Sequence, residues 1–299
     1  TDTVSVMRQG EMTATLQTAK TNPEQLAELM VGRKVLLQIN KKPPKIGRSS
    51  LSCNMLNYTD EKGVHRLKNV SFHVNQGEIL GIAGVAGNGQ SELLEVLAGI
   101  KQADGKININ SNTILLNSKE SNPLTRRRLG IAHVPEDRQK LGLVMDFYAW
   151  ENMALGYHNS EQYNANGIFM DNSLLKVETE ERMKNFDIRP TNITLQAKSF
   201  SGGNQQKIVL AREIEQNPDI LIVGQPTRGV DIGAIEFIHK RIIQLRDAGK
   251  AVILISVELD EILSLSDRIL VMFDGKIMGE KTTAYTNEKE LGLLMAGIG

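Results

Sequence analysis

The alternation of apolar runs with amphipathic stretches predicts that short buried strands alternate with helices along most of the chain. Residues 78–99 show this unit most clearly, because a short apolar strand is followed by a glycine-rich turn and an amphipathic helix. Further apolar strands are predicted at 220–223 and 269–273, and a long helix at 207–216. We therefore expect an α/β core around a mainly parallel sheet. Two additions are predicted: an antiparallel β layer near 48–77 and 105–118, and a helical subdomain near 145–200.

A repeat links the two ends of the chain. Residues 1–32 align without a gap on residues 266–297, and 12 of the 32 pairs are identical. Each copy predicts a strand, a glycine turn, a second strand and a helix, with Asn22 as cap and Pro23 as first residue of the earlier helix. Leu26, Leu29 and Met30 would share one face of that helix. We expect residues 1–32 to be the tail of an earlier, similar domain; the alternative is a hairpin and helix that resemble the later ones by accident.

A basic segment, residues 33–48, separates this tail from the domain expected at 49–299. It has six basic residues and no acids, and Pro43 and Pro44 favour an extended linker. Such a run can lie near acidic lipid headgroups, but a solvated linker is the simpler interpretation.

Composition narrows the class of protein. The 299 residues contain 35 Lys plus Arg and 35 Asp plus Glu, so net charge gives no reason to expect nucleic-acid binding. The single cysteine, Cys53, cannot form an internal disulfide and is expected to be a small buried residue in a reducing compartment. No apolar run reaches the ~18 residues needed to span a bilayer, so any membrane role would be peripheral.

The turn at residues 84–91 matches the phosphate-binding P-loop pattern G-x-x-x-x-G-K-[ST] except at the lysine. Its glycines let backbone N–H groups face an anion, and the helix that follows adds positive potential. Gln90 replaces the lysine and carries no charge, whereas Ser91 keeps the hydroxyl that would ligate magnesium. A plain strand-to-helix turn explains the stretch about as well. The candidate nucleotide-binding residues here are Gly84, Gly87, Asn88, Gly89, Gln90 and Ser91.

A second motif is far more specific. Residues 199–207 read SFSGGNQQK and open the long predicted helix, and residues 217–231 read NPDILIVGQPTRGVD. Here the chain resembles ATP-binding-cassette (ABC) ATPases: the first run looks like their signature motif, the strand at 220–223 like their Walker B strand, and residues 226–231 like their D-loop. The order and spacing of the three motifs also fit that family.

The resemblance implies a P-loop NTPase core with an antiparallel β subdomain and a helical subdomain. In this family two domains meet head to tail, and each ATP is held between the P-loop of one domain and the signature of the other. A signature serine, glycine amides and a helix N-terminus would form a second anion cradle. The residues expected to serve a partner domain's ATP are Ser201, Gly202, Gly203, Asn204, Gln205 and Asp231.

Several positions depart from the family pattern. Gly224 and Gln225 stand where an aspartate for magnesium and a glutamate for water are usual, and Val257 stands at the switch histidine. Glu136 replaces the Q-loop glutamine, and Asn204 stands where many signatures have glutamine. With Gln90, these changes remove the lysine, the metal carboxylate, the base and the histidine from one site. We therefore expect the isolated chain not to hydrolyse ATP.

Weak nucleotide binding stays open, because the backbone cradle is kept. Tyr58 is placed where the family has an adenine-stacking aromatic, although strand-edge packing explains it equally well. Mg²⁺ is expected mainly in the intact site of a partner domain, with Ser91 as a weak ligand in this one.

The VPEDR run at 134–138 and the SGGNQQK signature look most like tandem-domain importers of sugars and nucleosides, and Gln225 looks like the nucleoside branch. The resemblance implies a preceding nucleotide-binding domain, membrane permease subunits and, indirectly, an extracytoplasmic binding protein as partners, at the cytoplasmic face of the membrane. Phe147, Tyr148 and Trp150 are candidates for the permease contact, or equally for the core of the helical subdomain. An autonomous ATPase, a structural module without nucleotide and a soluble cassette protein of DNA repair or translation are the alternatives.

Overall fold

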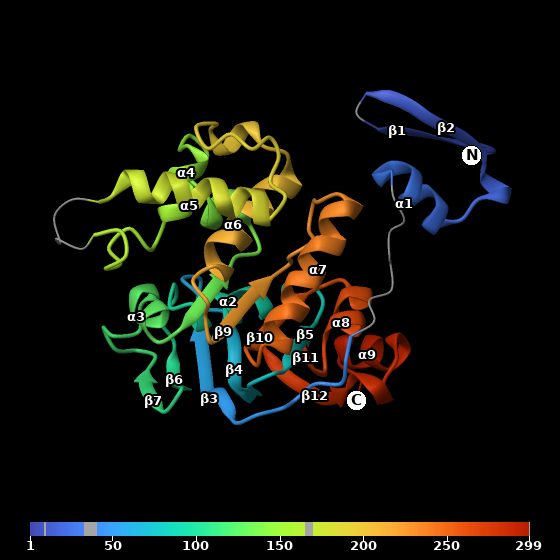
Figure 1. The fold of residues 1–299 in the computed structure, drawn as a ribbon. Helices are drawn as coiled ribbons and strands as arrows, with labels where there is room; N and C mark the ends of the chain where they lie inside the picture. The colour runs from blue at the N-terminus through green and yellow to red at the C-terminus, as the bar shows by residue number, and fades with distance from the viewer. Residues whose placement is uncertain (9, 33–40, 165–169, 299) are drawn as a thin grey trace.

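The computed structural model describes the whole chain except residues 9, 33–40, 165–169 and 299. A six-stranded sheet in the order β12-β11-β5-β10-β9-β8 forms its centre (Figure 1). Neighbouring strands from β11 to β8 are parallel, and β12 is antiparallel to β11. The predicted α/β core with a mainly parallel sheet is confirmed. The strands are β5 (Ile79–Ala83), β8 (Ile131–Val134), β9 (Ile220–Gly224), β10 (Ala251–Ser256), β11 (Arg268–Phe273) and β12 (Lys276–Thr282).

Both faces of this sheet are covered, which explains why its strands are continuous apolar runs. Along β10, Val252 and Leu254 belong to one hydrophobic core, whereas Ile253 and Ile255 belong to the other. The alternation follows from the two-residue period of a strand. The helices packed around the sheet are α2 (Gln90–Leu97), α3 (Pro123–Arg128), α7 (Ile232–Asp247), α8 (Leu259–Leu265) and α9 (Glu288–Met295).

The predicted antiparallel β layer is a four-stranded sheet in the order β4-β3-β6-β7. Its buried side chains share a core with α2 and the central sheet, as Leu51 and Leu93 illustrate. Cys53 lies in this core as the sequence predicts, and burial raises the pKa of its thiol. The strands are β3 (Ser49–Thr59), β4 (His65–Asn75), β6 (Asp104–Ile109) and β7 (Asn112–Leu115).

A helical layer stands above the central sheet (Figure 1). It begins with a single π-helical turn, η2, and is joined to the sheet through the buried helix α6, whose residues Ile208 to Ala211 are fully buried. Phe186 meets Phe237 of α7 edge to face at 5.8 Å between ring centroids. The elements are η2 (Arg138–Gly142), α4 (Ala149–Ala154), α5 (Asn172–Asn185), η3 (Ala197–Ser199) and α6 (Gly202–Ile214).

The N-terminal unit repeats the C-terminal one in structure as well as in sequence. It consists of β1 (Thr3–Arg8), β2 (Glu11–Gln17), η1 (Thr18–Lys20) and α1 (Pro23–Val31), and its counterpart continues from β12 through η4 (Thr283–Tyr285) to α9. The register of β1 with β2 equals that of β11 with β12, and a bulge follows Val6 in one and Val271 in the other. Asn22 and Asn287 cap the two helices through their side chains.

The two copies differ in what covers them. β11 also pairs with β5, whereas β1 pairs with β2 alone among the strands of the described chain. Met7 is therefore 60% exposed, while its counterpart Met272 is 0% exposed. Among the side chains of α1 that the structure describes, Ala27 is the most buried and Met30 is exposed, so the predicted apolar face is displaced toward Ala27.

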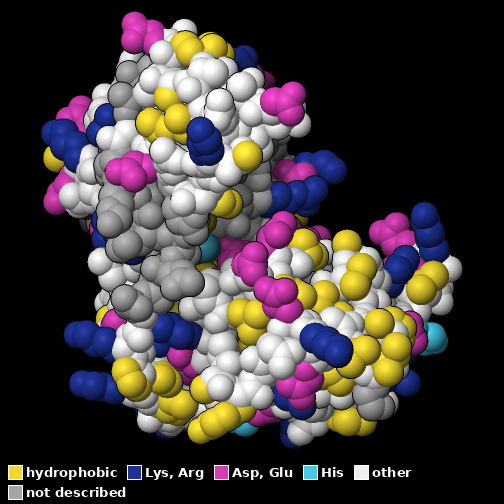
Figure 2. All heavy atoms as spheres, turned by 90° about the vertical axis from the view of Figure 1, so that its right-hand side faces the viewer, with side chains coloured by type: hydrophobic (Ala, Val, Ile, Leu, Met, Phe, Trp, Pro, Cys, Tyr) yellow, Lys and Arg dark blue, Asp and Glu magenta, His cyan; other side chains and the backbone are white. Residues whose placement is uncertain are grey.

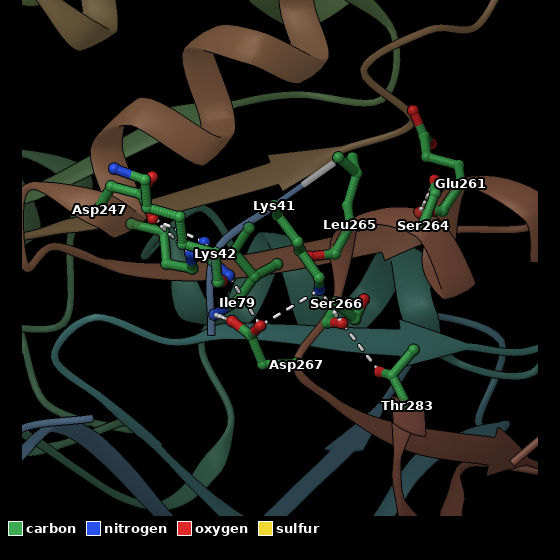
Figure 3. Close-up of polar contacts among 11 residues, drawn as sticks. Lys41, Lys42, Ile79, Asp247, Glu261, Ser264, Leu265, Ser266, Asp267 and Thr283 are labelled. Atoms are coloured by element: carbon green, nitrogen blue, oxygen red, sulfur yellow. Dashed lines mark hydrogen bonds and ion pairs between the residues drawn. The ribbon is translucent and has the colours of Figure 1, made fainter. Parts of the chain in front are cut away.

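The described end of the basic segment is docked on the domain through Lys41 and through backbone groups. Residues 41–47 form neither helix nor strand, in agreement with the proline pair. Lys41 Nζ donates to the carbonyls of Leu265 and Ser266 and pairs with Asp267 at 3.2 Å (Figure 3). The fully buried Arg246 donates to the carbonyl of Lys42 at 2.8 Å and to Asp267 at 2.9 Å. The expectation of a merely solvated linker is wrong for the Lys41 side chain and the Lys42 carbonyl, whereas the side chains of Lys42, Lys45 and Arg48 are exposed as it expects. Residues 33–40 lie outside the described part.

The surface carries both signs of charge. On the face shown in Figure 2, Lys and Arg are interspersed with Asp and Glu and with small apolar patches. This agrees with the equal numbers of basic and acidic residues. Within the described ranges, no helix combines the length and apolarity that crossing a bilayer requires.

Candidate nucleotide site and signature face

The phosphate-type loop joins β5 to α2 along the edge of a pocket of about 310 Å³. Gly87 and Gly89 have φ of 93° and 103°, a left-handed conformation that favours glycine. Asn88 turns away from the pocket, because its Oδ1 and carbonyl accept hydrogen bonds from the N–H groups of Asp274 and Gly275. The pocket is lined by Ala86, Gly87, Gln90, Ser91, Glu136, Gln225, Arg228, Val257 and Glu258.

Gln90 folds back onto the loop. A Cβ added to Gly84 would lie 2.1 Å from Gln90 Nε2, so only glycine leaves room for the amide there. Gln90 is 4% exposed, and its Nε2 has no hydrogen-bond partner within the described chain. A buried donor without an acceptor lowers the free energy of unfolding by about 1–3 kcal/mol, so an added hydrogen-bond acceptor would stabilise this amide.

Ser91 and Glu136 meet in the lining of the pocket. Ser91 Oγ donates a 2.6 Å hydrogen bond to Glu136 Oε2. Behind them Gly224 is buried at the end of β9, and a Cβ there would come within 2.6 Å of Glu136 Cγ. Gln225 and Val257 line the same pocket, so the structure brings these substituted positions together in one place.

Tyr58 does not line the pocket. Its ring lies half-buried at the edge of β3, with Lys101 Nζ 5.2 Å from the ring centroid. Both interpretations of Tyr58, adenine stacking and packing at a strand edge, stay predictions.

The signature run forms the N-terminus of α6 and caps it. Ser201 is the N-cap, and its Oγ accepts a 2.9 Å hydrogen bond from Asn204 Nδ2 and a longer one, at 3.4 Å, from the Asn204 N–H. Asn204 Oδ1 accepts from the N–H of Arg189, so the loop is held from both sides. Ser201 is exposed. Gln205 differs, because it is buried and donates to the carbonyls of Ala197 and Phe200. Its amide supports the loop from inside.

The D-loop packs directly against the signature. A Cβ on Gly203 would lie 2.8 Å from Asp231 Oδ2, and Asp231 itself caps α7 by accepting from the N–H of Ala234 at 2.9 Å. The two helix N-termini therefore lie side by side, with Gly202 and Gly203 kept free of side chains between them.

Arg138 is a residue that the sequence analysis did not single out. It follows Glu136 by two positions and donates to the carbonyls of Arg228 at 2.7 Å and Gly229 at 3.2 Å. A Cβ on Gly202 would lie 2.6 Å from its guanidinium. Arg138 thus connects the segment that lines the chain's own pocket with the D-loop and the signature. Its place in the VPEDR run was the available signal.

A buried ionic cluster ties the helical layer to the core. Glu213 accepts from Arg127 at 2.8 Å, from Arg212 at 2.9 Å and from the Tyr157 hydroxyl at 2.7 Å. Burial alone would raise the pKa of Glu213, but the two guanidinium groups outweigh it and lower the pKa to about 2. Burial lowers the pKa of the neighbouring His133 to about 4. Arg212 also donates to the carbonyl of Gly142, the last residue of η2.

The three clustered aromatics divide between surface and interior. Phe147 and Tyr148 are 44% and 43% exposed. Trp150 is half-buried against the small core of Ala154 and Leu175. Phe147 and Trp150 line an open, mostly apolar groove of about 460 Å³ on the helical layer. The groove is an exposed apolar surface of the kind that partner proteins cover.

Comparison with known proteins places this arrangement in a family. The sequence profile of the ABC transporter family matches residues 67–228. The guanosine import ATP-binding protein NupO of Bacillus subtilis is 45% identical over 299 residues, covering 99% of this chain and 57% of NupO. The nucleoside import ATP-binding protein NupA of Lactococcus lactis is 43% identical, covering 99% of this chain and 58% of NupA. The glucose import ATP-binding protein TsgD13 of Haloferax volcanii is 38% identical over 301 residues, covering 100% of this chain and 54% of TsgD13. This chain spans little more than half the length of these relatives.

Solved structures share the fold. A nucleotide-free ATP-binding cassette of an ABC transporter superposes with a TM-score of 0.65 at 24% identity, over 83% of this chain and 95% of that one. A dimeric ATP-binding cassette bound to ADP and Pi superposes with a TM-score of 0.65 at 23% identity, over 78% of this chain and 98% of that one. The predicted P-loop NTPase fold of the ABC type, with its antiparallel sheet and helical part, is confirmed.

Proposed function

This chain belongs to the ABC transporter family, and we propose that it is the ATP-binding component of an importer that completes the ATP site of a neighbouring domain. The observation that carries the proposal is the contrast between two surfaces of the same domain. The signature face keeps an exposed serine at a helix N-terminus. At the chain's own site, Gln90, Gly224, Gln225 and Val257 stand at the positions where the family has the lysine, aspartate, glutamate and histidine used in hydrolysis.

The signature face supports anion binding from outside. Ser201 and the N-terminus of the thirteen-residue helix α6 offer a hydroxyl and positive helix-dipole potential to a phosphate. Asn204 holds the serine, and Asp231 packs beside Gly203. These groups would stabilise charge on the γ-phosphate of an ATP that another domain binds. The carboxylate, base and cation for that reaction would come from the other domain.

The chain's own pocket is proposed to bind a nucleotide without hydrolysing it, or to bind none. Gln225 and Val257 line it where a base and a histidine are usual, and neither transfers a proton at neutral pH. Ser91 is engaged by Glu136. We infer that this pocket does not turn over ATP, and that a structural half without nucleotide is the main rival description.

The neighbouring domain is inferred to belong to the same polypeptide. The unit formed by β1, β2, η1 and α1 has the register, bulge and caps of the unit that ends this domain. Its strand β1 exposes the side that β11 uses to pair with β5. A domain equivalent to residues 49–299 would supply that missing strand.

Membrane permease subunits are the proposed further partners, with an extracytoplasmic binding protein reached through them. Phe147 and Trp150 in the apolar groove are the proposed contact, with the exposed Tyr148 beside it, which places the chain peripherally on the cytoplasmic face. Relatives named for guanosine, nucleoside and glucose import favour nucleosides, with sugars second, as the cargo class. No residue of this chain is proposed to touch the cargo.

Two substitutions in the full-length, two-domain protein test the proposal. Ser201→Arg places a long cation in the partner's phosphate cradle and is expected to abolish transport-coupled ATPase activity. Gln90→Ala removes one uncharged amide from the other pocket and is expected to retain most of it. Equal losses from both, or steady phosphate release by this chain alone that disappears with Ser91→Ala, would contradict the division of labour.

A further inference from the structure

We propose that Glu261 of α8 is a positioning residue for the ATP site of the neighbouring domain, because it fixes the D-loop through a buried junction with Thr227 and His239. This role rests on the proposed function and deepens it, since it assigns a residue behind the D-loop to the site that the signature face completes. Glu261 does not line the chain's own pocket. It acts through Thr227.

One carboxyl oxygen of Glu261 joins three elements. Thr227 Oγ1, in the D-loop, donates a 2.9 Å hydrogen bond to Glu261 Oε1. His239 Nε2, on α7, is 2.9 Å from the same oxygen. Glu261 lies on α8, where its carbonyl accepts from the Ser264 hydroxyl at 3.1 Å (Figure 3). The junction therefore fastens the D-loop to the two helices that precede and follow β10 in the chain.

The junction is buried, so water does not compete for its hydrogen bonds. Glu261 is 5% exposed and His239 is 9% exposed. Glu261 Oε2 is also buried and has no hydrogen-bond partner within the described chain, so the two contacts of Oε1 carry the polar pairing of this carboxyl group. Burial of such a group costs free energy that an apolar side chain at 261 would avoid. The position that Glu261 gives to Thr227 explains its presence.

Three successive D-loop residues are held by groups from distant elements. Glu261 holds the side chain of Thr227. Arg138 holds the carbonyls of Arg228 and Gly229, at 2.7 Å and 3.2 Å. The two supports come from α8 and from η2, and each binds a different part of the loop, so neither replaces the other.

The fixed loop leads directly into the signature face. Asp231 follows Thr227 by four residues and caps α7, and its Oδ2 would lie 2.8 Å from a Cβ on Gly203. A D-loop released from Glu261 could move against the signature that presents Ser201. Catalysis depends on placing such groups to within a fraction of an ångström, so the rate of hydrolysis would fall more than the affinity for ATP.

Removal of the Thr227 hydroxyl tests the junction. In the proposed two-domain protein, Thr227→Val keeps the side-chain size and should lower kcat for ATP hydrolysis about tenfold, with KM within about twofold. Glu261→Leu should reproduce this loss. Thr227→Ser keeps the donor and Glu261→Gln keeps an acceptor oxygen, so both should retain most of kcat. Thr179→Val removes a buried hydroxyl that donates to the Leu175 carbonyl at 2.7 Å in α5, and it serves as the matched control.

Amide hydrogen exchange of the 299-residue chain gives a readout independent of turnover. Residues 226–231 should exchange faster in Thr227→Val and in Glu261→Leu than in Thr179→Val, because the loop opens locally once it loses its support. Circular dichroism confirms that each variant folds. If Glu261→Leu does not fold, the contrast between Thr227→Val and Thr227→Ser decides.

Unchanged kcat in Thr227→Val, an equal loss in Thr179→Val, or equal losses in Thr227→Ser and Thr227→Val would each overturn the role of Glu261. The proposed function fails separately. If Ser201→Arg leaves ATPase activity intact, the signature role is wrong. If Ser201→Arg is inactive and Thr227→Val is fully active, only the role of Glu261 is wrong.

Discussion

Arg138 Nη1 donates a 2.7 Å hydrogen bond to the backbone carbonyl of Arg228, ninety residues later in the chain. The contact joins η2, which directly follows the pocket segment, to the D-loop, which packs on the signature. A second hydrogen bond runs from Arg138 Nη2 to the carbonyl of Gly229, so the planar guanidinium group holds two successive carbonyls at once. The ammonium group of a lysine cannot reproduce this planar, two-pronged geometry.

Replacement of the Arg138 guanidinium group is expected to impair the ATP site of the proposed neighbouring domain. In the proposed two-domain protein, Arg138→Lys should lower ATPase activity about tenfold, equivalent to ~1.4 kcal/mol, because the D-loop and signature lose their common support. Steady-state phosphate release gives the measurement. Lys140→Gln, which removes an 82%-exposed charge from the same turn, serves as control. If both variants matched the unmodified protein, Arg138 would be a local packing residue only.

The cluster around Glu213 predicts a large loss of stability. Glu213→Gln would leave the buried guanidinium group of Arg212 and the part-buried one of Arg127 without their counter-charge, at a cost of about 3–5 kcal/mol. Chemical denaturation monitored by circular dichroism measures the free energy of unfolding. The exposed pair of Lys198 and Asp146 offers the matched control, since Asp146→Asn should cost no more than about 1 kcal/mol. Similar values for the two variants would show that the cluster contributes no more than a surface pair.

His133 predicts a pH dependence of stability. Its Nε2 is buried without a partner in the described chain, and burial lowers its pKa to about 4 from an ordinary value of 6.5. The unfolded chain therefore takes up the proton first, so the stabilisation is complete above pH 6.5 and is lost as the pH falls toward 4. The loss from this residue should stay below about 3 kcal/mol.

Melting temperatures across this pH range measure the effect. His133→Gln should flatten the decline between pH 6.5 and 4. The Glu213 carboxyl, whose folded pKa is about 2, should still cause a loss below about pH 4.5. An unchanged slope in the variant would assign the decline to other groups.

Lys41 predicts protection of the linker from proteolysis. Its Nζ holds the carbonyl of Leu265 at 2.7 Å and the Asp267 carboxylate at 3.2 Å. Lys41→Gln should leave the melting temperature nearly unchanged, because Arg246 still pairs with Asp267, but should accelerate tryptic cleavage after Lys45 several-fold. Lys68→Gln removes another lysine–aspartate pair, with Asp274, and should not affect this site. Cleavage at the original rate would mean that Arg246 alone secures the segment.

Local pattern was enough to predict most of the fold. The apolar runs that became β9 and β11, the glycine turn before α2 and the capped helices depend on interactions within a few residues, which the sequence displays directly. The repeat was equally visible, and the identical register and bulge of its two copies show that equal sequences imposed equal local structure. The family and the substituted pocket positions followed from ordered motifs for the same reason.

Contacts between distant segments were beyond such reasoning. That Glu136 occupies the space beside Gly224, that Arg138 supports the D-loop, and that Lys41 is docked and not solvated all depend on how strands and loops far apart in the chain are packed. Gln205 looked like a group for a partner's nucleotide but is turned inward by two carbonyls of its own loop. The residue type at each position determines which chemical groups the chain has available. Burial and long-range packing decide which of those groups face one another, because both depend on all the neighbours that surround a residue in the folded chain.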